Sequence, residues 1–158
     1  MRNFENFSKR DTADDMVKII ETLGYNKFSE IGHDRGGRCG YRLDLDFPDR
    51  LKKLVVLDIV PTYTTFSRLD ARGAYVGFHW YFMGQEPGFP EKLIGANPEF
   101  YFTFLCNSWA GEEDPFTPEA REQYIADFKN PKTIRATCDE YSNNARADFE
   151  YDKTDKES

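Results

Sequence analysis

Apolar residues near the start of the chain recur with helical spacing. In residues 13–24 (ADDMVKIIETLG) they fall at i, i+3, i+4 and i+7, which places them on one face of a helix. These apolar positions are Met16, Ile19, Ile20 and Leu23. Asp11 or Thr12 is suited to cap the start of this helix, and Gly24 is suited to end it. The pattern therefore predicts an amphipathic helix over this segment.

The spacing then changes. Residues 27–32 (KFSEIG) and 51–60 (LKKLVVLDIV) each have the short apolar pattern of a strand. Residues 37–50 (GRCGYRLDLDFPDR), between them, predict a helix closed by Pro48. The apolar run at 55–57 is continuous, which is typical of a strand covered on both faces. Strand, helix and strand in this order predict a parallel pair with a right-handed crossover.

The strand signal ends at Phe66, and helical patterns follow. The expected helices lie near residues 66–85, 90–95, 97–108, 117–129 and 131–147. Four prolines fall near the starts of these helices, where proline is tolerated. They are Pro90, Pro98, Pro118 and Pro131. The last residues, EYDKTDKES, are polar, and we expect a frayed end.

This layout leaves the predicted sheet short. Two parallel strands expose both edges and most of both faces, and an α/β domain needs more strands than these residues supply. The sequence therefore predicts the middle part of a longer protein.

Composition narrows the class of protein. The 158 residues are 39% hydrophobic and 16% aromatic, which excludes a disordered chain. A net charge of −7 argues against nucleic acid or an anionic membrane as partner, because both select basic surfaces. The three cysteines are odd in number and widely spaced, so they indicate neither a disulfide framework nor a zinc site. With no signal peptide and no membrane-length apolar run, we expect a cytoplasmic protein.

Candidate chemistry begins in the stretch GHDRGGR. Gly32, Asp34 and Gly36 alternate directly after a predicted strand and before a predicted helix. This is the pattern of a nucleophile elbow, in which a sharp turn exposes the central side chain and small residues on either side prevent collision. The helix start adds positive potential. An ionised aspartate in that position can attack a saturated carbon without losing a proton first.

Two aspartates share the predicted site. Asp58 follows the second strand, so its carboxylate is expected at the same carboxyl edge of the sheet as Asp34, where parallel α/β folds bind ligands. Each also has an ordinary structural interpretation. Asp34 suits a turn or a helix N-cap, and Asp58 suits the end of a strand before a turn.

Several separated motifs carry a family resemblance that runs from about Ser8 to Asp155. In order they are GHDRGGR, VLDIVPT, HWYFMGQ, LIGANPEFY and ATCDEY. The chain resembles the haloacetate (fluoroacetate) dehalogenases of the α/β-hydrolase fold. The resemblance implies an α/β protein with a partial hydrolase core at residues 1–62, a helical cap at 63–147 and a polar tail at 148–158.

The resemblance also implies roles for individual residues. Asp34 would be the nucleophile, and the position of Asp58 after the second strand makes it a second candidate catalytic residue. Arg35 and Arg38 would bind the substrate carboxylate, for which the forked guanidinium is suited. A halide pocket would be formed by His79, Trp80 and Tyr141. The substrate would be a small 2-haloacid, no metal or organic cofactor is needed, and the full-length enzyme is a candidate homodimer.

Some of these residues also have structural interpretations. Trp80 suits a cap core, His79 suits a hydrogen-bonded helix position, and Arg38 suits a solvated helix surface. Judged without the resemblance, these interpretations are favoured for Trp80 and His79.

None of the residues assigned so far is a general base. Hydrolysis of an aspartyl ester normally uses a histidine late in the chain. The sequence contains two histidines: His33 precedes the nucleophile, and His79 belongs to the expected cap. We therefore expect this chain to form the ester once and not to turn over.

Two rival functions remain at this stage. An epoxide hydrolase has the same nucleophile and uses cap tyrosines as acids, and the predicted cap has candidates at Tyr75, Tyr81, Tyr101 and Tyr124. Arg35 next to the nucleophile favours a carboxylate substrate instead. The second rival is a non-catalytic binding protein whose open sheet edges pair with a partner chain.

Overall fold

A computed structural model describes residues 7–157, which form two compact units. The first contains the described residues up to Phe78 together with 143–157, and the second contains His79–Ser142. The expected domain limits were 1–62, 63–147 and 148–158. The structure instead joins the end of the chain to the first unit.

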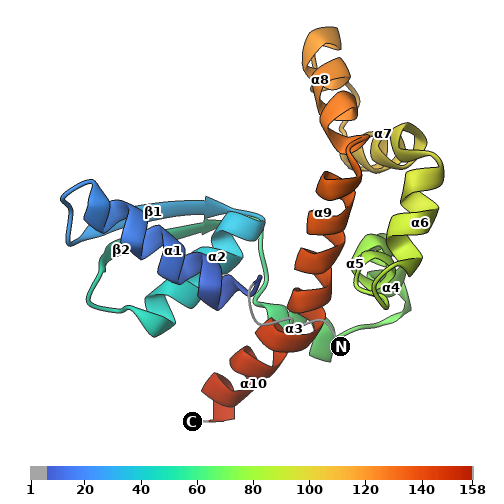
Figure 1. Cartoon of the computed structure of the whole chain (residues 1–158). Coiled ribbons are helices and arrows are strands. Elements are labelled where there is room, and N and C mark those ends of the chain that lie inside the picture. Colours follow the sequence, from blue (N-terminus) through green and yellow to red (C-terminus); the bar gives the residue numbers. More distant parts are fainter. Residues whose placement is uncertain (1–6, 158) are drawn as a thin grey trace. The chain divides into compact units, whose positions relative to one another are not determined.

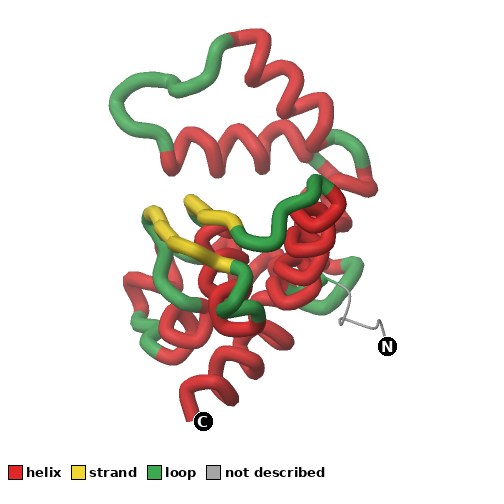
Figure 2. The backbone as a smooth tube through the Cα atoms, turned by 90° about the vertical axis from the view of Figure 1, so that its left-hand side faces the viewer, coloured by secondary structure: helices red, strands yellow, loops and turns green. Residues whose placement is uncertain are grey.

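The first unit contains the expected parallel βαβ arrangement. Strands β1 (Phe28–His33) and β2 (Leu51–Leu57) pair in parallel, and helix α2 (Arg35–Asp46) connects them. Figure 2 shows the two strands side by side. Ile31 lies opposite Val55 in the register, and His33 lies opposite Leu57. The last residues of the two strands therefore meet at one edge.

Helix α1 (Lys9–Thr22) packs on α2, and α2 packs on both strands (Figure 1). The buried cluster beneath α1 consists of Ala13, Val17, Cys39 and Leu43. The predicted stripe on this helix is wrong about which face is buried: Ile19 is 60% exposed and Leu23 is 64% exposed. The small side chain of Ala13 explains why the face with Ala13 and Val17 is buried, since it lets α1 and α2 approach closely.

The start of α1 also differs from the expected one. Ser8, rather than Asp11 or Thr12, is the N-cap, and its hydroxyl accepts from the Asp11 N–H at 3.2 Å. The Asp11 carboxylate accepts from the Ser8 N–H in return at 3.0 Å, which completes a capping box.

The strands are less covered than their sequence predicted. Val55, Val56 and Leu57 are all more than 40% exposed, and Ile31 is 72% exposed. The continuous apolar run of β2 was expected to be buried on both faces. Within the described residues the sheet has two strands, so much of its apolar surface is uncovered.

The end of the chain is helical, which corrects the expectation of a frayed tail. Helix α3 (Thr62–Ser67) lies against α10 (Phe149–Glu157). The Asp152 carboxylate on α10 is buried and accepts hydrogen bonds from the Tyr41 hydroxyl at 2.7 Å and the Tyr63 N–H at 3.2 Å. These bonds join residues about a hundred positions apart, so the local sequence could not reveal them.

A buried arginine connects α2 to α10. The Arg42 side chain is 2% exposed and is surrounded by three carboxylates. Its nitrogens lie 3.1 Å from Asp46, 3.5 Å from Asp152 and 2.5 Å from Asp155. Asp46 also binds Arg10 on α1 at 2.9 Å. Three helices of the first unit are thus joined by one ionic network.

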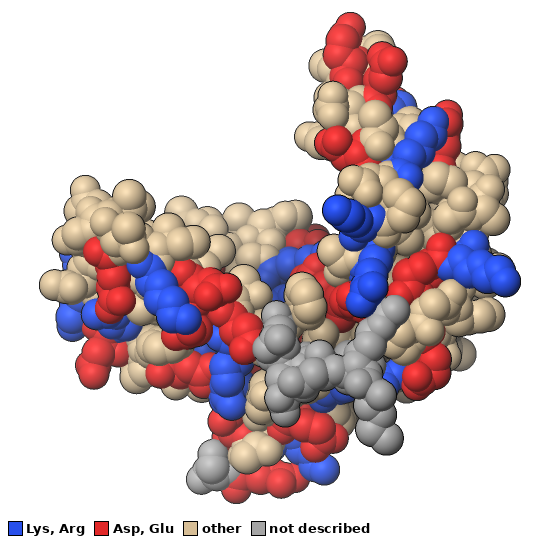
Figure 3. All heavy atoms as spheres, viewed as in Figure 1, with Lys and Arg blue, Asp and Glu red and all other residues tan. Residues whose placement is uncertain are grey.

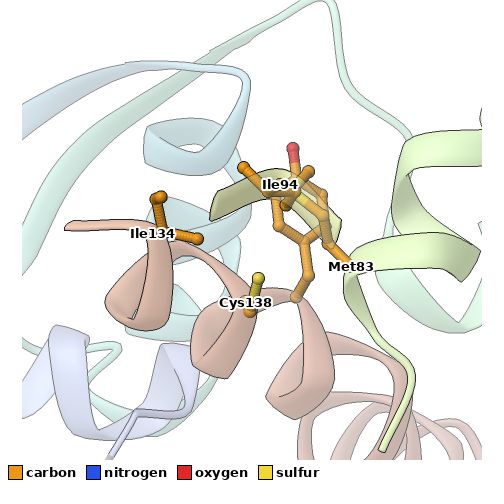
Figure 4. Packing of buried hydrophobic residues seen from close by; sticks show 5 residues of the cluster. Met83, Ile94, Ile134 and Cys138 are labelled. Atoms are coloured by element: carbon orange, nitrogen blue, oxygen red, sulfur yellow. The ribbon is translucent and has the colours of Figure 1, made fainter. Parts of the chain in front are cut away.

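Helix α4 (Ala71–Val76) also belongs to the first unit, and α5 (Phe78–Met83) begins at the boundary between the units. The second unit continues with helices that have the expected prolines at their first or second residue. They are α6 (Phe89–Ala96), α7 (Pro98–Trp109), α8 (Pro118–Phe128) and α9 (Pro131–Asn143). In its core, the side chains of Met83, Ile94, Ile134 and Cys138 point toward one another (Figure 4).

Helix α9 continues into α10 through a π-helical segment, η2 (Asn144–Asp148). The Asp148 carboxylate accepts from the Lys9 N–H at the start of α1, at 2.8 Å. The helix predicted at 131–147 is therefore confirmed and extends to Glu157.

Glu30 gives the first unit a specific dependence on pH. A Cβ atom placed on Gly40 of α2 would lie 2.8 Å from Glu30 Oε1, so α2 covers the Glu30 carboxyl. This burial raises the pKa of Glu30 above the ordinary 4.5. The unfolded chain loses this proton first, so the contribution of Glu30 to stability is greatest below about pH 4.5 and is lost as pH rises through its folded pKa. Glu30→Gln should therefore raise the melting temperature modestly at pH 7 and leave it unchanged at pH 3.5. Thermal denaturation at both values checks this, and an equal effect at both would contradict it.

The surface carries both signs of charge. On the face in Figure 3, acidic and basic side chains are interspersed. None of the described helices combines the length and the apolar character that crossing a membrane demands.

Candidate active site

Asp34 occupies the turn between β1 and α2, with φ 50° and ψ −116°. A positive φ is uncommon outside glycine and is found where surrounding structure imposes it. The cause lies in Gly32. A Cβ atom there would lie 2.5 Å from the backbone carbon and oxygen of Gly36, so strand and helix approach too closely for any side chain. This is the geometry of a nucleophile elbow.

The two flanking glycines are not equivalent, which corrects the symmetrical expectation. A Cβ atom on Gly36 would have nothing within 4 Å. Gly36 contributes the backbone against which a side chain at position 32 would collide.

This difference gives a matched pair of variants. Gly32→Ala should destabilise the chain by about 1–3 kcal/mol, as for other substitutions that force the backbone apart. Gly36→Ala should be neutral or stabilising by up to about 1 kcal/mol, because alanine favours the helix. Urea unfolding of both variants checks this. Equal effects of the two substitutions would contradict the packing argument.

Asp34 stands at the N-cap position of α2, but its side chain is exposed and makes no capping hydrogen bond to the helix. Its backbone N–H donates to the Leu57 carbonyl at 3.3 Å, immediately before Asp58. Asp58 also has a positive φ, 51°. Both aspartates therefore follow paired strand ends at one edge, as expected.

The two arginines lie in the first turn of α2. Arg35 is its first residue and is half-buried. Arg38 follows one turn after Asp34 and is 5% exposed, so it is not a solvated surface residue. Its guanidinium donates to the Thr62 hydroxyl at 3.2 Å and to the Thr65 hydroxyl at 3.4 Å. The helix start adds its own positive potential to these two cations.

An aromatic cluster forms around the predicted halide residues in the second unit. His79 is buried, and its ring centroid lies 5.7 Å from that of Tyr141. The Trp80 and Tyr141 rings meet edge to face at 5.5 Å. The structure thus brings His79, Trp80 and Tyr141 together. Tyr141 also belongs to the buried core of this unit, so the packing interpretation and the functional one apply to the same residues.

Sequence reasoning missed one member of this cluster. Trp109, at the end of α7, lies edge to face with His79 at 4.8 Å, closer than either predicted partner. Its indole N–H is a donor of the same kind as that of Trp80. A tryptophan at a helix end carries no local signal for this contact, which depends on how α7 folds back on α5.

The predicted residues therefore fall into two sets, one in each unit. Asp34, Arg35, Arg38 and Asp58 belong to the first, and the aromatic cluster belongs to the second. His33 is exposed on β1, next to the nucleophile. Across residues 7–157, no three His, Cys, Asp or Glu side chains converge to hold a metal ion.

Known proteins are similar to this chain in sequence and in fold. It is 41% identical over 151 residues to a fluoroacetate dehalogenase from Burkholderia sp, covering 95% of this chain and 50% of that protein. It is 28% identical over 147 residues to a soluble epoxide hydrolase from Corynebacterium sp. (strain C12), covering 91% and 51%. The crystal structure of ALR0039 from Nostoc sp PCC 7120 superposes with a TM-score of 0.93 at 41% identity, covering 100% and 54%.

The chain thus spans about half the length of the relatives it matches. The profile of the alpha/beta hydrolase fold matches residues 2–154, nearly the whole sequence. With the parallel βαβ unit and the elbow at Asp34, this match shows that the chain belongs to the α/β-hydrolase family.

Proposed function

We propose that this chain carries the nucleophilic and substrate-binding part of a hydrolase that removes halide from a small 2-haloacid. The observation that carries the proposal is the elbow at Asp34, followed within one helical turn by the buried Arg38. A carboxylate nucleophile needs cations beside it if the substrate is also a carboxylate. Similarity to the fluoroacetate dehalogenase supports the same substrate class.

The proposed step is a displacement at saturated carbon. A carboxylate oxygen of Asp34 attacks the α-carbon of the haloacid, the carbon–halogen bond breaks, and the halide leaves with the electron pair. Arg35 and Arg38 bind the substrate carboxylate and offset its repulsion from Asp34. The N–H and O–H donors of His79, Trp80 and Tyr141 stabilise the departing halide. The product is the carboxymethyl ester of Asp34.

Cleavage of that ester requires an activated water. The two histidines of the sequence are His33 and His79, and neither has the late position from which the fold normally supplies its base. We propose that this chain stops at the ester, so that each molecule releases one halide.

The test uses the chain with fluoroacetate and, separately, with chloroacetate. Halide release is measured with ion-selective electrodes, and the peptide containing Asp34 is examined by mass spectrometry. One equivalent of halide and a carboxymethyl ester on Asp34 are expected. Chloroacetate also alkylates thiols, so only modification of the Asp34 peptide counts. Continuing release of halide would contradict the single-turnover proposal, and release without an adduct or its hydrolysis product would contradict the nucleophile.

Opening of an epoxide is the second candidate, supported by the similarity to a soluble epoxide hydrolase and by the buried Tyr141 beside Trp80. A neutral epoxide does not need the arginines. Arg38→Met should therefore reduce ester formation from chloroacetate and leave ester formation from styrene oxide unchanged. Reaction with styrene oxide alone would favour this candidate over the first.

A further inference from the structure

Within the first unit, a series of hydrogen-bonded polar groups begins at Arg38 and continues to residues outside the predicted site. The Arg38 guanidinium donates to Thr62 Oγ1 at 3.2 Å. The Tyr41 hydroxyl oxygen lies 3.0 Å from the same Thr62 oxygen and 2.7 Å from Asp152 Oδ2. Thr62 is fully buried, and Asp152 is 8% exposed. Arg38 is thus connected to a buried carboxylate through two hydroxyl groups.

Donor counting fixes the direction of this chain. Tyr41 has one hydroxyl hydrogen, and an ionised carboxylate can only accept, so that hydrogen points to Asp152. The Tyr41 oxygen then accepts from the Thr62 N–H at 3.1 Å and from the Thr62 hydroxyl. The Thr62 oxygen, in turn, accepts from Arg38. Each hydroxyl therefore donates its hydrogen toward Asp152 and accepts a hydrogen bond from the Arg38 side of the series.

The charge environment supports this direction. Burial raises the pKa of the Tyr41 hydroxyl well above its ordinary value of 10, so the group stays protonated at neutral pH. The Asp152 carboxylate also lies 3.5 Å from the guanidinium of the buried Arg42. Arg42 thus holds the carboxylate end of the chain, and the hydrogen bonds run from Asp152 through both hydroxyls to the Arg38 guanidinium.

We propose that Asp152, Tyr41 and Thr62 are positioning residues that hold the Arg38 guanidinium in the orientation that binds the substrate carboxylate. This inference rests on the proposed function, because it assigns the orientation of a group that the function uses. Asp152 lies on α10, so this helix contributes to the site through the series of hydrogen bonds that joins Asp152, Tyr41, Thr62 and Arg38. We call this series the relay.

The first test observes Arg38 directly. In the chain labelled with 15N-arginine, rotation about the guanidinium Cζ–Nη bonds of Arg38 is measured by NMR line shape. Tyr41→Phe keeps the ring but removes the central hydroxyl, and should accelerate this rotation about fivefold, the factor for one net hydrogen bond. Tyr151→Phe is the control: it makes the same chemical change on α10, where the Tyr151 ring lies beneath the guanidinium of Arg10 on α1. Unchanged rotation in Tyr41→Phe would overturn the proposal.

A second pair of variants guards against loss of folding. Thr62→Ser retains the hydroxyl and should behave as the native chain, whereas Thr62→Val removes it and should behave as Tyr41→Phe. Far-UV circular dichroism establishes that each variant is folded. Loosening of Arg38 by both Thr62 variants, or by neither, would overturn the role of the hydroxyl.

The third measurement separates this proposal from the proposed function. The rate of Asp34 ester formation is followed against chloroacetate concentration. Tyr41→Phe should raise the half-saturating concentration about fivefold with little change in the maximal rate, because the relay acts on binding of the carboxylate. If Arg38 loosens and the half-saturating concentration stays constant, the relay stands and the carboxylate-binding role of Arg38 fails. If Arg38 does not loosen while Arg38→Met abolishes saturation, the function stands and the relay fails.

Discussion

Replacing Asp34 by asparagine is expected to abolish ester formation and halide release while leaving the fold intact. The amide has nearly the same shape but lacks the negative oxygen that attacks the substrate carbon, and removing a nucleophile typically lowers rates by about four orders of magnitude or more. Because Asp34 is exposed and makes no capping bond, the substitution should leave the unfolding midpoint nearly unchanged. Fluoride release and mass spectrometry of the peptide provide the measurement.

Asp44→Asn is the matched control for this experiment. Asp44 is an exposed aspartate on α2, so its substitution makes the same change in charge away from the elbow. It should release halide at the native rate. Halide release by Asp34→Asn equal to that of Asp44→Asn would exclude Asp34 as the nucleophile.

Replacing Arg42 by methionine is expected to have the largest effect on stability, a loss of about 3–5 kcal/mol. Methionine fills much of the same space, but Asp46, Asp152 and Asp155 would be left around a site that is 2% exposed in the native chain. Removing the partner of a buried charge destabilises the folded state far more than the intact ion pair stabilises it. Guanidinium chloride unfolding, followed by circular dichroism at neutral pH, measures the difference.

Arg135→Met gives the comparison for an exposed pair. Arg135 is 59% exposed and lies 3.4 Å from Asp139 on one turn of α9. Surface pairs of this kind contribute about 0–1 kcal/mol, so this variant should unfold nearly as the native chain does. A loss below about 1 kcal/mol for Arg42→Met would show that the three carboxylates are hydrated or protonated without Arg42.

The parts of the fold that depend on neighbouring residues could be predicted from the sequence. The parallel βαβ unit follows from apolar spacing and its glycine turn, and the later helices begin where proline is tolerated. The buried face of α1 could not be predicted. Its periodicity offered a stripe of larger residues, and contact with α2 selected Ala13 and Val17 instead.

The helical end of the chain failed as a prediction for the same reason. Residues 149–157 are polar, and by themselves give no cause to fold. Asp152 is held there by Tyr41 and Arg42, which lie more than a hundred positions earlier. A charged segment that would fray alone becomes a helix when its carboxylates complete a buried network.

The candidate site was partly predictable in a similar way. The elbow is a local motif, so Asp34 and its glycines could be found from spacing. The burial of Arg38 and its bonds to threonines on α3 depend on how α3 packs, and the contact between Trp109 and His79 depends on how α7 folds back. Types of residue were visible in the sequence, whereas their surroundings were not.

The left-handed backbone at Asp34 and Asp58 has an evolutionary consequence. Each strand is followed directly by a non-glycine residue with φ near 50°, a conformation that typically costs about 1 kcal/mol or more and that glycine adopts without this penalty. Selection for thermal stability alone would therefore favour glycine at both strand ends. The two aspartates thus carry a cost in stability, and under the proposed function a change to glycine at position 34 would be an early sign that a lineage no longer needs the nucleophile.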